Sequence, residues 1–160
     1  MKPSHALLAL LLATPLLAAE PLPIPVVKPV LRAVQSQTKF VFFECRGNEL
    51  FHVDRDALAA QAANANYTVD PAFITATGML RLQPKKGVHG ETVADLSRPD
   101  SQYRKLLAKL KPTTSALLFF QREDSADILQ RAQQIAQTAG FETAVMPLPK
   151  DNPIMFNKEN

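Results

Sequence analysis

Cys45 and His52 are the two residues of this chain whose types and spacing could support nucleophilic catalysis. Cys45 directly follows the apolar run KFVFFE, and His52 comes after a predicted turn at residues 46–48, so a β-hairpin could bring thiol and imidazole together. A catalytic thiolate needs a base within reach and a group that orients the base, which Glu44 or Asp54 could supply. The opposing interpretation is that a Cys beside FVFF is a small buried residue, and that a one-residue shift in register separates the two side chains.

The second candidate is an anion-binding or glycan-binding loop at residues 85–90, KKGVHG. Lys85, Lys86 and His89 could supply positive charge, while the two glycines of the loop permit backbone conformations that direct N–H groups toward an anion. Arg46, in the turn of the predicted hairpin, is a further candidate for binding. The loop lacks the GK[ST] spacing of a phosphate-binding loop, so a flexible basic turn is the alternative.

No metal ion or cofactor is expected, because the sequence lacks the ligand spacing that either would need. His52 and His89 stand far apart and have no Cys pair or second nearby His beside them. Glu123, Asp124 and Asp127 could form a carboxylate pair, but they lie at the start of a predicted helix. There Asp124 would accept hydrogen bonds from the first free backbone N–H groups. The negative charge of Asp127 would lie near the positive end of the helix dipole.

The composition argues against nucleic acid as a partner. The 160-residue chain has 18 Lys and Arg against 15 Asp and Glu, for a formal net charge of +3. The basic residues are scattered, and no aromatic residues interleave with them as a nucleic-acid-binding surface would need. The single Cys cannot form an internal disulfide, so stability must come from an ordinary core.

Residues 1–19 are typical of a secretory signal peptide, with Lys2 as a positive start and an apolar core at residues 6–13. The apolar run is too short to span a bilayer comfortably. Cleavage after Ala19 would place Leu17 where a small residue is preferred, so an uncleaved membrane anchor is the alternative. The protein is therefore expected in the periplasm or outside the cell.

Three further segments follow the expected signal peptide. Residues 20–37 contain four prolines, which forbid a helix and predict an extended Pro-rich linker. A single α/β domain is expected at residues 38–147. Residues 148–160, which contain further prolines and end in polar residues, are expected to form a disordered tail.

Hydrophobic periodicity predicts a sheet layered with helices. Strands are expected at residues 39–44, 49–53, 78–83, 116–121 and 141–146, and helices at residues 54–65, after Ser97, and at residues 128–139. The last strand, helix and strand should form a βαβ unit with parallel strands. The predicted fold class is α/β (α+β), a small mixed sheet of about four to five strands packed against two to three helices.

Residues 114–147, TSALLFFQREDSADILQRAQQIAQTAGFETAVMP, resemble part of the periplasmic domain of biopolymer-transport proteins of the ExbD and TolR type. The shared pattern is a strand, an acidic turn, an amphipathic helix, Gly-Phe and a final strand. That family also has a full membrane helix with an acidic residue for proton coupling, whereas residues 6–19 are short and contain no acidic residue. The resemblance implies a possible fold and an envelope location, and no functional residue is carried over.

The first functional hypothesis is a non-catalytic, exported α/β domain that binds another envelope protein or an assembly surface. It rests on the lack of a convergent catalytic set in the sequence. The alternatives are a Cys-dependent enzyme that uses Cys45 and His52, and an anion- or glycan-binding module.

Overall fold

The computed structural model describes residues 38–60 and 64–158, which lie within one compact unit of the chain that spans residues 31–160. The expected signal peptide at residues 1–19 and the expected linker at residues 20–37 lie outside the described residues. None of the described helices is long and apolar enough to cross a membrane.

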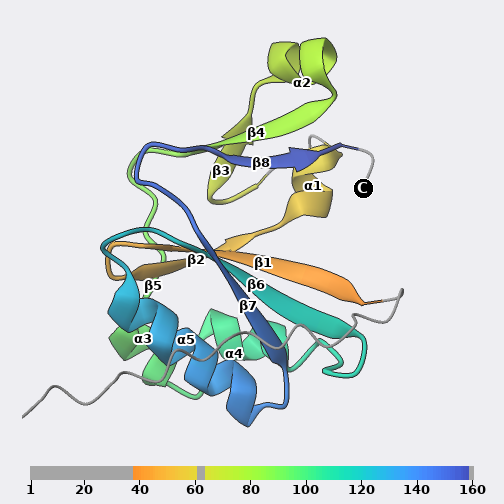
Figure 1. Cartoon of the computed structure of the whole chain (residues 1–160). Helices are drawn as coiled ribbons and strands as arrows, with labels where there is room; N and C mark the ends of the chain where they lie inside the picture. The colour runs from red at the N-terminus through yellow and green to blue at the C-terminus, as the bar shows by residue number, and fades with distance from the viewer. Residues whose placement is uncertain (1–37, 61–63, 159–160) are drawn as a thin grey trace, which may run out of the picture. The chain divides into compact units, whose positions relative to one another are not determined.

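A five-stranded mixed sheet with the strand order β5-β2-β1-β6-β7 organises the domain (Figure 1). Its strands are β1 (Lys39–Arg46), β2 (Glu49–Val53), β5 (Glu91–Thr92), β6 (Ser115–Gln121) and β7 (Glu142–Pro147). β1, β6 and β7 are parallel neighbours, and β2 runs antiparallel to β1. The predicted fold class, a small mixed sheet packed against helices, is confirmed.

β6, α5 (Ala126–Thr138) and β7 form the predicted C-terminal βαβ unit. The apolar stripe predicted from helical periodicity is Ile128, Leu129, Ala132, Ile135, Ala136 and Ala139. The helix buries the first five, and Ala139 is exposed at its C-cap. The chain leaves α5 through Gly140, whose φ of 85° is the left-handed conformation expected there. The start of the helix differs from the prediction, because its N-cap residue is Ser125. Asp124 instead accepts a hydrogen bond from the Gly47 N–H at 3.1 Å, which links the start of α5 to the β1–β2 turn.

Two short helices, α3 (Val93–Ser97) and α4 (Gln102–Leu107), replace the single helix predicted after Ser97. Ser97 ends α3, and the Ser101 hydroxyl caps α4 by accepting the Arg104 N–H at 3.1 Å. Arg98 lies between them in an extended conformation with ψ 141°. The break follows from the proline at position 99, because a residue before proline is disfavoured in the helical region.

A second sheet of three strands, with the order β3-β4-β8, was not predicted. It consists of β3 (Tyr67–Val69), β4 (Met79–Pro84) and β8 (Ile154–Asn157). The expectation of a disordered tail at residues 148–160 is therefore wrong for residues 154–157. Pro149 and Pro153 suggested a frayed tail, but both lie before the first residue of β8. Ile154 and Phe156 turn toward an apolar cluster while the backbone pairs with β4.

Two more short helices accompany the second sheet. α1 (Arg55–Ala59) begins at the predicted cap, where the Asp54 carboxylate accepts the Ala57 N–H at 3.0 Å, and it is shorter than the predicted helix. α2 (Pro71–Thr77) lies in a stretch without a predicted element. Asp70 caps α2 and Gly78, with φ 69°, ends it. The turn-rich sequence therefore concealed only α2, whose two caps are of an ordinary kind.

An apolar core lies on each side of the five-stranded sheet. On one side, α3, α4 and α5 pack over a cluster that includes Val41, Phe43, Cys45, Leu96, Tyr103, Leu117, Phe119, Ile128 and Ala132. On the other side, α1 and the second sheet pack over Phe51, Val53, Leu58, Tyr67, Leu82, Phe120 and Ile154. Helices therefore cover one face of the five-stranded sheet, and the second sheet covers part of the other (Figure 1).

Candidate functional site

Polar and exposed apolar side chains meet on the face of the five-stranded sheet that packs against the second sheet, which we call the inter-sheet face. On β1 this face carries the alternate residues from Phe40 to Arg46. The parallel register places residues of β6 and β7 in rows beside them, namely Phe42, Leu118 and Ala144 in one row and Glu44, Phe120 and Met146 in the next. The face is apolar toward the start of the parallel strands and charged toward their carboxyl ends.

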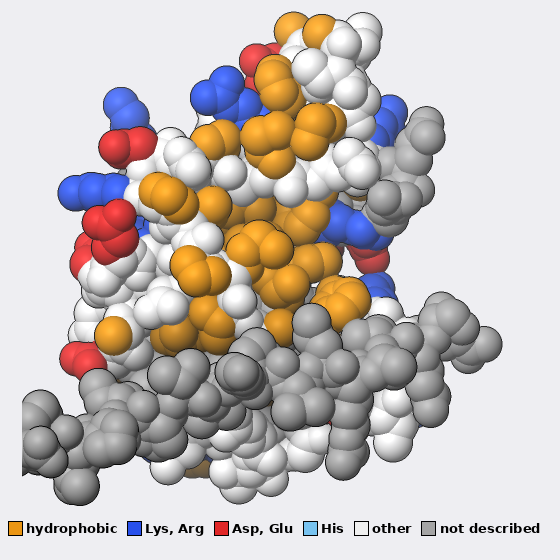
Figure 2. Space-filling model, in the orientation of Figure 1, with side chains coloured by type: hydrophobic (Ala, Val, Ile, Leu, Met, Phe, Trp, Pro, Cys, Tyr) orange, Lys and Arg blue, Asp and Glu red, His pale blue; other side chains and the backbone are white. Residues whose placement is uncertain are grey.

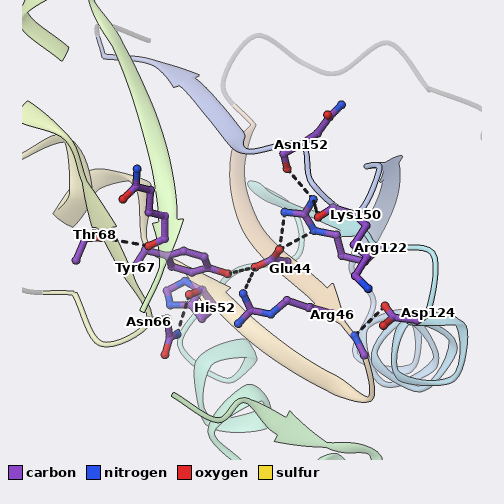
Figure 3. Close-up of polar contacts among 12 residues, drawn as sticks. Glu44, Arg46, His52, Asn66, Tyr67, Thr68, Arg122, Asp124, Lys150 and Asn152 are labelled. Carbon is purple, nitrogen blue, oxygen red and sulfur yellow. Dashed lines mark hydrogen bonds and ion pairs between the residues drawn. The ribbon is translucent and has the colours of Figure 1, made fainter. Parts of the chain in front are cut away.

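Glu44 is fully buried on the inter-sheet face, within a strand that is otherwise largely apolar. Its Oε1 accepts a hydrogen bond from Arg122 Nε at 2.8 Å and lies 2.7 Å from Arg122 Nη2. Its Oε2 accepts a hydrogen bond from the Tyr67 hydroxyl at 2.7 Å, and Arg46 Nη1 lies 3.8 Å away. Figure 3 shows these three side chains converging on the carboxylate. The charge of Glu44 is therefore paired, as burial of a carboxylate requires.

Arg122 directly follows β6 and fastens the chain after β7 to the sheet. Its Nη1 donates hydrogen bonds to the carbonyl oxygens of Pro149 at 2.6 Å and Asn152 at 2.7 Å, and it lies 3.3 Å from that of Lys150. The rest of the guanidinium is engaged by Glu44. Arg122 is therefore saturated by partners within the chain, and it holds the loop at residues 149–152 in place.

Tyr67 connects the second sheet to Glu44. Burial raises the pKa of the Tyr67 phenol far above its ordinary value, and the negative charge of Glu44 raises it further. The hydroxyl therefore stays protonated and donates a hydrogen bond to Glu44. The network joins β1, β3, β6 and the loop at residues 149–152, and it ties the two sheets together.

The sequence pointed to Glu44 only as a possible orienting group for catalysis and to Arg46 only as a general binding candidate. It gave no indication of Tyr67 or Arg122. One signal was available, because a carboxylate inside an apolar strand must find a buried partner. Arg122 follows the neighbouring strand of the same sheet, so it was the cation to consider first.

A cavity of about 370 Å³ opens beside this network. Glu44, Arg46, Tyr67 and Arg122 line it together with residues 81–84 of β4 and residues 150–154. It lies at the carboxyl ends of β1 and β6, the edge of a parallel sheet at which ligands usually bind. Its volume is in the range of small-molecule sites.

The structure does not assemble the nucleophile and base suggested by Cys45 and His52. The hairpin register places Leu50 opposite Cys45, and Phe43 opposite His52. Burial raises the pKa of Cys45 to about 12, with a smaller contribution from the negative Glu44, and burial also lowers the pKa of His52. Alternation along β1 directs Glu44 to the opposite face from Cys45. The thiol is therefore protonated at neutral pH and serves as a small core residue.

The basic loop residues are held by separate local contacts. Lys85 Nζ donates a hydrogen bond to the Asn64 carbonyl, and Lys86 is exposed. His89, with a side chain 84 % exposed, lies 3.2 Å from Glu49 Oε1. A Cβ atom at Gly90 would lie 2.5 Å from the Leu50 carbonyl oxygen, so close packing alone explains this glycine. Of the predicted binding residues, only Arg46 reaches the cavity.

Metal-binding geometry is not found in the part of the chain that the structure describes. There, no group of three or more His, Cys, Asp or Glu residues is placed to hold a metal ion. Of the acidic residues near the start of α5, Asp124 accepts the Gly47 N–H and Asp127 lies in the first helical turn. These contacts account for both residues without catalysis.

An apolar patch extends from the start of β1 across β6 to the edge strand β7, and we define it as Phe40, Phe42, Leu118, Ala144, Met146 and Phe156. Phe156 of β8 packs over Phe42, with ring centroids 4.8 Å apart, and marks the boundary with the covered part of the face. Met146 is 47 % exposed. Figure 2 shows hydrophobic side chains gathered in the middle of the view, in the region where β8 packs against β1.

β7 lies at the edge of the five-stranded sheet and pairs only with β6 among the described strands. Val145 and Met146, on opposite faces of β7, are both exposed. Pro147 ends the strand and cannot donate a backbone hydrogen bond. The apolar patch therefore continues to an edge strand of the sheet.

Comparisons with protein families, curated proteins and solved structures found no match to this chain. The resemblance of residues 114–147 to the ExbD and TolR type thus stays a prediction. The function has to be argued from the geometry of the inter-sheet face.

Proposed function

We propose that this protein is a non-catalytic α/β domain that binds another protein through the apolar patch. The observation that carries the proposal is the exposed Met146 on the edge strand β7, which pairs with Phe120 and lies next to the apolar row of Phe42, Leu118 and Ala144. An apolar surface of this kind, rimmed by polar residues, is typical of protein-binding sites.

The edge position of β7 supports the same proposal. A partner that presents an extended segment would pair its backbone with the outer side of β7 and place alternate side chains against Met146 and Ala144. Backbone pairing would contribute affinity, and the apolar rows of the inter-sheet face would contribute specificity.

The charged part of the face supports a structural role and argues against catalysis. The Glu44 carboxylate is saturated by Arg122 and Tyr67, and the Cys45 thiol is protonated at neutral pH. With the signal-like residues 1–19 and the Pro-rich residues 20–37, we further propose an exported domain on a tether, whose partner is an envelope protein or an assembly surface.

Site-specific photo-crosslinking tests the proposal. A benzophenone amino acid at position 146 is expected to give one discrete crosslinked protein in cells. The matched control is position 155, because Met155 is 41 % exposed but alternation on β8 directs it away from Phe156 and the apolar patch. With the captured protein purified, Met146→Lys should weaken binding about tenfold or more, the loss typical of a central interface residue.

Met155→Lys should leave that affinity unchanged. Equal crosslinking from positions 146 and 155, or binding that survives Met146→Lys, would show that the apolar patch is not the contact surface.

A further inference from the structure

We propose that the cavity beside Glu44 binds a small organic anion through a carboxylate or phosphate group, with Arg46 as the residue that holds the charge. This site lies at the carboxyl ends of β1 and β6, and none of the six residues of the apolar patch lines its cavity. It does not depend on the proposed protein interaction.

The balance of charge in the network favours an anion. One buried carboxylate, Glu44, faces the two guanidinium groups of Arg122 and Arg46. Arg122 takes the short contacts to Glu44 and saturates its remaining donors with backbone carbonyls. The second guanidinium therefore adds a positive charge that the network does not neutralise.

Arg46 is also positioned to use that charge. Its guanidinium carbon lies 4.3 Å from the centroid of the Phe51 ring, so the planar group is stacked and oriented before any ligand arrives. At 3.8 Å from Glu44 Oε2, it is beyond hydrogen-bonding distance. The guanidinium of Arg46 makes no hydrogen bond to the residues that the structure describes, and the side chain is 32 % exposed beside the cavity.

Glu44 does not prevent an anion from binding. Its Oε1 is covered by Arg122, and its Oε2 accepts a hydrogen bond from the Tyr67 hydroxyl. A ligand oxyanion at the outer side of Arg46 therefore meets a carboxylate whose charge is already paired.

The remaining walls of the cavity define the rest of the ligand. Pro84, Pro153 and Ile154 contribute apolar surface. The same space is lined by Arg81 and Lys150 and by the carboxylates of Asp124 and Asp151, so with Glu44, Arg46 and Arg122 the lining holds four positive and three negative side chains. A ligand that fills about 370 Å³ and contacts such walls carries a short apolar portion in addition to its charged group. The geometry thus favours a small organic acid or phosphate ester over a free inorganic ion.

Titrations of the full chain, followed by NMR of backbone amides, test this site. The probes are butanoate and butyl phosphate, with acetate and inorganic phosphate as their counterparts without the apolar portion, all at constant ionic strength. We expect saturable shifts at residues 46 and 150–154, with the butyl compounds binding more tightly. Arg46→Gln should weaken binding about tenfold, because it removes a charge-assisted hydrogen bond.

Lys86→Gln is the matched control, since it removes the same charge from the exposed basic loop at residues 85–90. It should change the affinity less than twofold (~0.4 kcal/mol). Arg46→Lys keeps the charge without the planar fork, so a severalfold loss is expected even if Arg46→Gln fails to fold.

Three results would overturn the proposal. The first is the absence of saturable shifts up to about 10 mM probe, well above the ~1 mM Kd expected of such a contact. The second is an equal loss in Arg46→Gln and Lys86→Gln. The third is inorganic phosphate and acetate binding as tightly as the butyl compounds.

Discussion

The buried ion pair between Glu44 and Arg122 is the residue-scale feature with the largest expected effect on stability. Both side chains are almost fully buried. Besides each other, Glu44 contacts the Tyr67 hydroxyl, and Arg122 contacts backbone carbonyls of residues 149–152. Removing one member of such a pair lowers the stability strongly, because the remaining charge stays buried without a partner.

Glu44→Gln is predicted to lower the free energy of unfolding by about 3–5 kcal/mol. The amide keeps the shape of the side chain but leaves the Arg122 guanidinium without its counter-charge. Urea denaturation followed by circular dichroism would measure the change. The control is Asp100→Asn, which breaks the exposed ion pair with Arg98 and should leave the stability nearly unchanged. Similar losses in the two variants would contradict a special role for the buried pair.

Cys45 is predicted to be unreactive in the native protein. Burial raises the pKa of its thiol to about 12, so almost no thiolate exists at pH 8 and the sulfur is also shielded from reagents. Iodoacetamide at pH 8 should label the unfolded chain completely while the native chain stays unmodified, as measured by mass spectrometry. Rapid labelling of the folded protein would instead restore the hypothesis of a catalytic thiol.

At the scale of elements, β8 completes both the second sheet and the packing on the inter-sheet face. Its backbone pairs with β4 from Met79 to Leu82, and the Phe156 ring lies over those of Phe42 and Phe120. β8 also forms one wall of the cavity through Ile154. A segment that looked like a tail therefore contributes to the core and to the site.

Deletion of residues 154–160 is predicted to destabilise the domain by about 3 kcal/mol or more, since it removes the buried Ile154 and the packed Phe156. Hydrogen exchange should show faster exchange of those β4 amides that pair with β8, because β4 then keeps only β3 as a neighbour. Deletion of residues 159–160 alone is the control and should leave both readouts unchanged. Slow exchange of β4 in the longer deletion would mean that β8 is dispensable.

At the scale of the whole molecule, the elements that could be predicted from the sequence are those whose signals lie within a few neighbouring residues. The hairpin, the parallel strands β6 and β7, and the stripe of α5 were predicted because alternation, helical periodicity and the position of Gly140 each act over a few residues. The second sheet was not predicted, because β4 pairs with a strand far along the chain and no local pattern records that pairing.

The candidate site was predicted only in part for the same reason. Glu44 and Arg46 could be singled out, but their partners come from β3, from the end of β6 and from the loop at residues 149–152. The sequence also suggested that Cys45 and His52 act together, but the hairpin register pairs Cys45 with Leu50 and His52 with Phe43. Charged residues inside apolar strands were the better signal, because burial obliges them to find partners.

The contacts from Arg122 to residues 149–152 also have a consequence for biosynthesis. Chains are made from the N-terminus, so β1, β2 and β6 leave the ribosome before the segment that Arg122 binds and before β8. Until that segment emerges, the guanidinium lacks its carbonyl partners and β4 lacks one neighbour. The nascent chain therefore passes through a stage in which an apolar sheet face and an unpaired strand edge are exposed together, and that stage lasts until β8 has been synthesised.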